Sequence, residues 1–182
     1  PAKGPAALPC SLGPALRPAP PWHMQRGCGI YSFGRRQPQA EQIKGRMDFV
    51  ADCEVLHDPR TACCGVCGQT QLQATCHPNF GEVMGELKRA IADLHETLPK
   101  EQDLFIGVRC KRGRHRSVAI AELLQTCLRR SLACAVHHLH VQHCGCPVAC
   151  WNHPHEEHQH FAQCQAALGE AQAHAFTCWD GL

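Results

Sequence analysis

The chain has 182 residues, of which 19% are charged, and its formal net charge is +2. This length allows one domain with a sizeable hydrophobic core, together with extensions. The small net charge excludes a uniformly basic nucleic-acid-binding protein, so any basic function must be local. No run reaches the roughly 18 apolar residues of a membrane span, and no secretory signal pattern is visible.

Cysteine and histidine are unusually frequent, with 15 Cys and 14 His. An odd number of Cys cannot pair completely within the chain, and Cys that cluster with His suit zinc better than disulfides. We therefore expect a reducing, intracellular location and assign it to the cytoplasm. Because the sequence begins with Pro1 and not Met, we expect a fragment or processed product, which leaves organelle targeting open.

The first half of the chain predicts two strands and one long helix. Residues 1–28 are rich in Pro, Ala and Gly and predict a linker or disordered arm. Strands are predicted at 29–33 and 49–53. They are followed by a loop at 60–78, which a bound metal ion could hold in place. Residues 79–98 predict a helix, because apolar residues recur on one face at helical spacing. Asn79 with Glu82 predicts a capping box at its start.

The second half predicts a strand at 104–108, a helix at 117–130 and a strand at 133–141. Strand, loop, helix and strand form a βαβ unit, so we predict an α/β fold. It consists of a small sheet with a parallel pair, a phosphate-binding loop and Cys/His-rich extensions. We place the α/β domain at 29–141 and a Cys/His-rich tail, with a weak helix at 156–176, at 142–182. On the last strand, we expect one of His137 and His138 to face inward as a satisfied structural histidine.

Residues 109–117, RCKRGRHRS, join the predicted strand to the predicted helix and hold five Lys or Arg. Ligands of open α/β sheets bind at the carboxyl ends of strands, and a helix N-terminus attracts anions. Gly113 lets the backbone curl around an anion, Arg116 can grip two phosphate oxygens, and Ser117 can cap the helix. A solvated charge run is the alternative reading. The candidate ligand-binding residues are Cys110, Lys111, Arg112, Gly113, Arg114, His115, Arg116 and Ser117.

The loop also has the C-x5-R-S spacing, which resembles the phosphate loop of Cys-dependent protein tyrosine phosphatases. There a thiolate attacks phosphorus while Arg and loop amides hold the oxyanion. In this alternative Cys110 is the nucleophile and Arg116 its partner. Arg109 replaces the His that usually precedes the Cys, and no Asp lies between Asp58 and Asp93 to act as general acid. We therefore favour binding without catalysis.

The longer string CKRGRHRSVAIAELL (110–124) resembles the RapZ C-terminal domain family. Upstream, residues 32–34 (SFG) and 48–59 (DFVADCEVLHDP) are similar to that family's first and second motifs. Positions that match in the second motif are Asp52, Leu56 and Pro59. In the longer string they are Cys110, Gly113, His115, Arg116, Ser117, Val118, Ile120, Ala121 and Glu122.

The resemblance implies an α/β domain that binds small RNA and glucosamine-6-phosphate, with the loop in its anion-binding pocket. It also implies a nucleotide-binding family, because full RapZ proteins carry an N-terminal P-loop domain. No G-x4-G-K-[ST] motif occurs in this chain, so no nucleotide cofactor is expected. Arg109, Lys111 and Arg112 stand where the family has small residues, which favours a highly charged anion or RNA backbone. Glu54 stands where the family has Arg. The expected partner is a phosphorylated small molecule or RNA, not a membrane.

Two Cys/His clusters are candidate zinc sites, because structural zinc is held by four thiolate or imidazole ligands. The alternative for the second cluster is a solvated polar tail. Zinc would make the chain a zinc-dependent RNA or protein interaction module, which is a third interpretation. The first candidate set is Cys64, Cys67, Cys76 and His77. The second is Cys144, Cys146, Cys150 and His153, with His155, His158 and His160 as alternatives.

Overall fold

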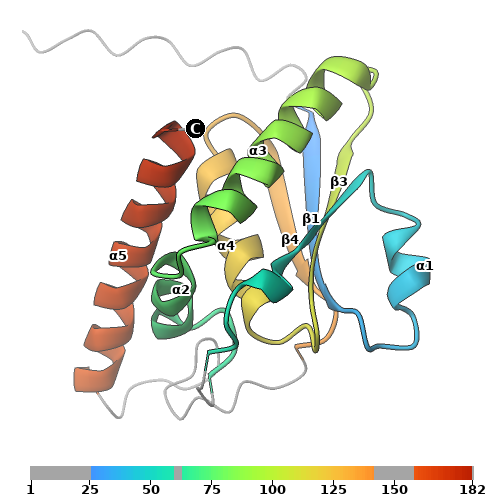
Figure 1. The fold of residues 1–182 in the computed structure, drawn as a ribbon. Coiled ribbons are helices and arrows are strands. Elements are labelled where there is room, and N and C mark those ends of the chain that lie inside the picture. Colours follow the sequence, from blue (N-terminus) through green and yellow to red (C-terminus); the bar gives the residue numbers. More distant parts are fainter. Residues whose placement is uncertain (1–25, 60–62, 142–157, 182) are drawn as a thin grey trace, which may run out of the picture.

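The computed structural model describes residues 26–59, 63–141 and 158–181 (Figure 1). Four strands form one sheet in the order β2-β3-β1-β4, and every neighbouring pair is parallel. The predicted α/β class is confirmed, with one difference: β1 lies between β3 and β4, so each of these strands pairs with β1. The strands are β1 (Gly27–Gly34), β2 (Phe49–Asp52), β3 (Leu104–Cys110) and β4 (Ala133–His138).

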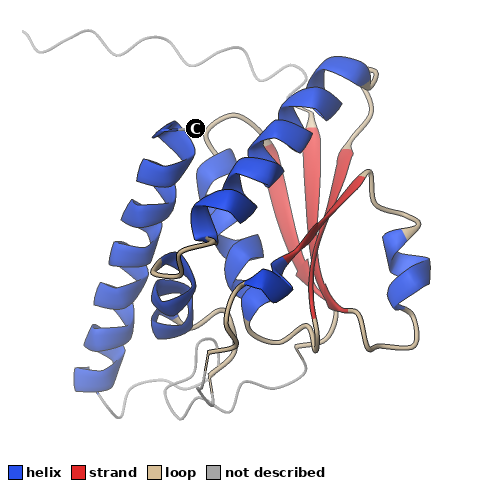
Figure 2. Ribbon diagram, in the orientation of Figure 1, coloured by secondary structure: helices blue, strands red, loops and turns tan. Residues whose placement is uncertain are grey.

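Most of the helices lie on one side of the sheet. Figures 1 and 2 show α2, α3, α4 and α5 together on that side, whereas α1 lies on the other. Helix α2 falls inside the segment predicted to be a loop, and the sequence pattern does not predict α1. Within the described residues, no helix is both long and apolar enough to cross a membrane. The helical elements are α1 (Ala40–Lys44), η1 (Cys53–Val55), α2 (Gly68–Thr75), α3 (Phe80–Thr97), α4 (Arg116–Leu128) and α5 (His158–Gly181).

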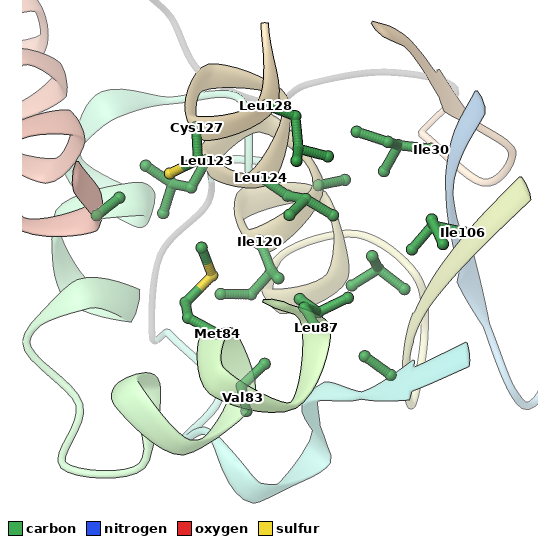
Figure 3. Packing of buried hydrophobic residues seen from close by; sticks show 14 of the residues in the cluster. Ile30, Val83, Met84, Leu87, Ile106, Ile120, Leu123, Leu124, Cys127 and Leu128 are labelled. Atoms are coloured by element: carbon green, nitrogen blue, oxygen red, sulfur yellow. The ribbon is translucent and has the colours of Figure 1, made fainter. Parts of the chain in front are cut away.

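The hydrophobic core lies between the sheet and helices α3 and α4 (Figure 3). The apolar face predicted for residues 79–98 points into this core, and α4 is buried along almost its whole length. Fully burying one large aliphatic side chain contributes about 1.5–3 kcal/mol to stability, so this core anchors the start of α4. Its fully buried members include Ile30, Val83, Met84, Leu87, Ile106, Ile120, Leu123 and Leu124.

Arg26 is buried and closes the C-terminal end of α3. Its guanidinium donates to the carbonyl oxygen of Leu98 at 2.7 Å and to those of Leu94 and His95 at 3.4 Å. It also donates to the carbonyl of Pro99. The last carbonyls of a helix have no hydrogen-bond donors within the helix, and the Arg26 guanidinium provides these donors. The ordered fold therefore includes residues 26–28 of the predicted arm.

Helix α5 packs against α2 and α4, and Ala171 and Ala175 join the main core. The part of the Cys/His-rich tail from residue 158 onward is thus integrated into the domain. On β4, His137 is exposed and stacks on Tyr31, with ring centroids 4.8 Å apart. His138 is partly buried and lies 2.8 Å from both Ser32 Oγ and Glu122 Oε1. His138 therefore faces inward and has hydrogen-bond partners, as predicted for one of the two histidines.

Candidate phosphate-binding site

The loop between β3 and α4 lies at the carboxyl edge of the sheet. The connection that leaves β1 runs through α1, and the connection that leaves β3 runs through α4 on the opposite side (Figure 1). Because β1 and β3 are neighbours, their carboxyl ends form a topological switch point, where open α/β sheets bind ligands. Residues 111–115, here called the basic turn, lie at this point.

The backbone of the basic turn packs directly on the end of β1. Gly113 has a φ of 75°, and a Cβ there would lie 2.5 Å from the backbone nitrogen of Gly34. Only glycine accepts both the left-handed conformation and this close approach. The Arg35 amide donates to the Cys110 carbonyl at 2.9 Å, which joins the two loops. The predicted role of Gly113 in shaping the turn agrees with this geometry.

Two cations on the β2 side of the site are paired with carboxylates. Arg109 donates to Asp52 Oδ2 through Nη2 at 3.1 Å and through Nε at 3.3 Å. Arg35 is paired with Glu54, the residue that stands where the family has Arg. These pairs lower the net positive charge on the β2 side of the site. The basic turn should therefore attract an anion more strongly than the β2 side does.

Four other cations form what we call the basic cluster, which consists of Arg36, Lys111, Arg112 and Arg114. Arg36 comes from the loop after β1, and its amide donates to the Lys111 carbonyl at 3.3 Å. Within the described residues, the side chains of the other three make no hydrogen bond or ion pair, and Arg112 and Arg114 are exposed. Local sequence patterns do not predict a role for Arg36, because only the strand order places its loop beside the basic turn.

Asp58 lies against the start of α4. Its Oδ1 is 3.2 Å from His115 Nδ1 and 3.8 Å from Arg116 Nε, and its side chain is 61% exposed. Two nearby nitrogens, His115 Nε2 and Arg116 Nε, are buried but have no hydrogen-bond partner among the described residues. Buried polar atoms usually have partners, so these two nitrogens at one helix start are donors that an added acceptor could satisfy.

The side chain of Arg116 also has a structural role. The residue is buried, and Nη1 donates to the carbonyls of Leu56 at 2.8 Å and Glu54 at 3.2 Å. The guanidinium therefore fixes the turn that follows β2 against the first turn of α4. Part of its donor capacity is committed to the protein, and its buried Nε makes no hydrogen bond among the described residues.

Cys110 and Ser117 are buried behind the basic turn. Cys110 Sγ accepts a hydrogen bond from the Gly113 amide at 3.2 Å and lies 3.3 Å from Ser117 Oγ. Ser117 is in the first turn of α4, where His115 is the N-cap and no side chain caps the helix. The expected capping role of Ser117 is therefore wrong, because its hydroxyl turns inward to the thiol.

His140 is a further side chain at this edge that the sequence analysis did not select. Its Nδ1 accepts a hydrogen bond from the Gly34 amide at 3.1 Å, beside the backbone that carries Gly113. Burial lowers the pKa of His140 below its usual value. A neutral imidazole with Nδ1 as acceptor carries its proton on Nε2, so His140 adds a hydrogen-bond donor at the end of β1.

A second turn, residues 64–68, packs on the basic turn, and we call it the thiol turn. The Gly65 amide donates to the Arg114 carbonyl at 2.9 Å. A Cβ on Gly65 would lie 2.1 Å from the His115 carbonyl oxygen, so the two backbones are in direct contact. Cys64 and Cys67, on either side of Gly65 in this turn, are both buried.

The structure does not assemble the first predicted zinc ligand set. Cys67 and Cys76 flank α2, whose eight residues span about 12 Å at 1.5 Å each. Cys76 is exposed, and His77 Nδ1 accepts the Asn79 amide at 3.1 Å. Among the described residues no three Cys, His, Asp or Glu already form a metal-binding group. The second set, Cys144, Cys146, Cys150 and His153, lies outside the described residues.

The parallel sheet, the strand-to-helix loop that packs on the end of β1 and the cations at the switch point define an α/β domain with a basic turn before α4. A family model described as the RapZ C-terminal domain matches residues 28–142. The chain belongs to this family, as the resemblance of residues 110–124 predicted. No curated protein gives a significant match to the chain.

Proposed function

We propose that the chain binds the phosphate group of a phosphorylated ligand at residues 109–117, without turning it over. The ligand would be an amino-sugar phosphate or the backbone of RNA. The observation that carries the proposal is the pair of buried nitrogens, His115 Nε2 and Arg116 Nε, that lack hydrogen-bond partners among the described residues. Phosphate oxygens are strong acceptors for such groups, most of all when the donor is charged.

The surroundings of these two nitrogens favour an anion. They lie at the N-terminus of α4, a 13-residue helix whose dipole and first amides attract negative charge. The basic cluster adds four cations from two neighbouring loops. Asp58 already places a carboxylate beside His115 and Arg116, and its exposure allows it to give way to a phosphate oxygen.

Burial of Cys110 supports binding without turnover. The thiol would have to reach phosphorus for a covalent mechanism, yet Cys110 is only 2% exposed and lies behind Gly113 and Ser117. A second interpretation stays open, because the C-x5-R-S spacing places Sγ beside a loop amide and a hydroxyl. A Cys-dependent phosphatase is therefore the second candidate. Release of phosphate from an aryl phosphate, abolished in Cys110→Ser, would support it over simple binding.

The direct test is calorimetric titration at physiological salt with glucosamine-6-phosphate, inorganic phosphate and unphosphorylated glucosamine. We expect the phosphorylated sugar to bind and glucosamine not to bind. Equal affinity for the two sugars, or no binding of either phosphate compound, would contradict the proposal. A short RNA titrated at several salt concentrations separates the two ligand classes, because phosphate-backbone binding weakens steeply as salt rises.

A double variant shows whether the basic cluster takes part. We expect Arg112→Ala with Arg114→Ala to lower phosphate affinity about tenfold, since exposed charged contacts contribute about 1 kcal/mol or less each. The matched control is Arg89→Ala, which removes an exposed arginine from α3. Equal losses in the double variant and the control would place the phosphate elsewhere.

A further inference from the structure

The thiol turn and helix α5 bring together two sulfur atoms that are 97 residues apart in the sequence. Cys67 Sγ lies 3.5 Å from Cys164 Sγ. Two thiolates that share a tetrahedral zinc ion, with bonds of about 2.3 Å, have sulfurs about 3.8 Å apart. A disulfide requires about 2.05 Å. The observed separation is that of two thiols within hydrogen-bonding distance, and it is also close to that of two ligands on one ion.

The backbone around this sulfur pair is arranged to hold it. The Gly68 amide, at the start of α2, donates to Cys164 Sγ at 3.3 Å. A Cβ on Gly68 would lie 2.1 Å from the Cys164 carbonyl oxygen and 2.7 Å from the Leu168 nitrogen. Glycine at position 68 is therefore what allows α5 to approach the thiol turn closely enough to place Cys164 beside Cys67.

Cys64 can supply a third sulfur. The Cys67 amide donates to the Cys64 carbonyl at 3.1 Å, which closes a four-residue turn. Such a turn brings the Cα atoms of its first and fourth residues within about 7 Å, so both thiols can reach one ion. Cys64 is buried, and the amide of the next residue, Gly65, donates to the Arg114 carbonyl of the basic turn.

We propose that Cys64, Cys67 and Cys164 bind one thiophilic divalent metal ion, with zinc as the expected occupant. The described side chains do not form a three-ligand group, so metal binding would require the three thiols to converge. Thiolates select soft metals such as zinc over calcium or magnesium. The ion would join the thiol turn to α5, and through the Gly65–Arg114 hydrogen bond it would support the basic turn. This inference does not depend on phosphate binding.

The test measures metal directly and requires no ligand for the phosphate site. Cobalt(II), a spectroscopic substitute for zinc, is titrated into the reduced full-length protein, and thiolate-to-cobalt charge-transfer absorption is recorded. We expect this absorption in the wild-type chain with at least one ion bound per molecule, and its displacement by zinc. Absence of the absorption in the wild-type protein would overturn the proposal, whatever the behaviour of any variant.

Variants then test which thiols are ligands. We expect Cys67→Ser and Cys164→Ser each to bind cobalt at least tenfold more weakly than the wild type. The matched control is Cys76→Ser, which lies at the other end of α2 and should bind as the wild type does. Circular dichroism checks that each variant is folded. Folded Cys67→Ser and Cys164→Ser proteins that keep wild-type affinity, or a Cys76→Ser protein that loses it equally, would refute the assignment.

Discussion

The basic turn before α4 and the thiol turn before α2 share a backbone arrangement but carry side chains of different chemistry. Each leads into the N-terminus of a helix, and each contains a glycine that permits close backbone contact. The basic turn carries Lys111, Arg112 and Arg114, whereas the thiol turn carries Cys64 and Cys67. The backbone presents amide donors in both turns, and the side chains decide whether a phosphate or a soft metal is favoured.

The two turns also differ in how they are held. The basic turn is fixed by the core beneath α4 and by the Arg116 guanidinium, which reaches two carbonyls after β2. The thiol turn rests on the basic turn and on α5. The hydrogen bond between the Gly65 amide and the Arg114 carbonyl joins them. A substitution in one turn should therefore affect the other turn as well. The effect should be larger the closer the substituted residue lies to this hydrogen bond.

The largest effect is expected from Arg116→Ala, which removes the support of the basic turn. Its loss leaves the carbonyls of Glu54 and Leu56 without their donor, and each unsatisfied buried group costs about 1–3 kcal/mol. We expect the free energy of unfolding to fall by about 2–4 kcal/mol, measured by urea denaturation. Phosphate affinity should fall as well, since Nε is lost. Arg89→Ala should change neither, and an Arg116→Ala protein as stable as the wild type would contradict the structural role.

A smaller effect is expected from Gly65→Ala, which pushes the two turns apart. The new Cβ would meet the His115 carbonyl at 2.1 Å and the Ala119 nitrogen at 2.5 Å. Overpacking of this kind costs about 1–3 kcal/mol. The matched control is Gly169→Ala on α5, where a Cβ meets nothing within 4 Å. That change should stabilise the protein by about 0.5–1 kcal/mol. Equal behaviour of the two variants in urea would show that the turns are not in contact.

The smallest effect is expected from Asp58→Asn, which removes a negative charge beside His115 and Arg116. Phosphate should then bind about fivefold more tightly, because an exposed charge interaction of this kind contributes about 1 kcal/mol or less. Stability should change little, since the Asp58 side chain is 61% exposed. Titration calorimetry with inorganic phosphate measures the change. Weaker binding in this variant would mean that Asp58 helps the ligand and does not compete with it.

Much of the fold could be predicted from local sequence patterns. The helical spacing of Val83, Leu87 and Ile91 placed α3, and the apolar run before the basic turn placed β3. The strand order could not be predicted in the same way, because it depends on which strands meet in space. For this reason the prediction paired β3 with β4 and did not place Arg36 beside the basic turn.

The predicted capping box at the start of α3 failed for a tertiary reason. The Asn79 side chain donates to the Val55 carbonyl at 3.3 Å, so it joins two segments and does not cap its own helix. The first predicted zinc ligand set shows the same limit of local sequence patterns. Sequence proximity grouped Cys67 with Cys76, yet α2 lies between them, and the sulfur next to Cys67 belongs to Cys164 on α5.

The predictions for the basic turn depend on the proposal that this turn and the start of α4 bind phosphate. The most direct measurement is a titration of isotope-labelled protein with inorganic phosphate, followed by the shifts of backbone amide resonances in NMR spectra. We expect the largest and saturable shifts at residues 113–117, with smaller shifts at the Gly34 amide. Shifts that are absent there, or larger at the exposed Arg89 on α3, would contradict the account.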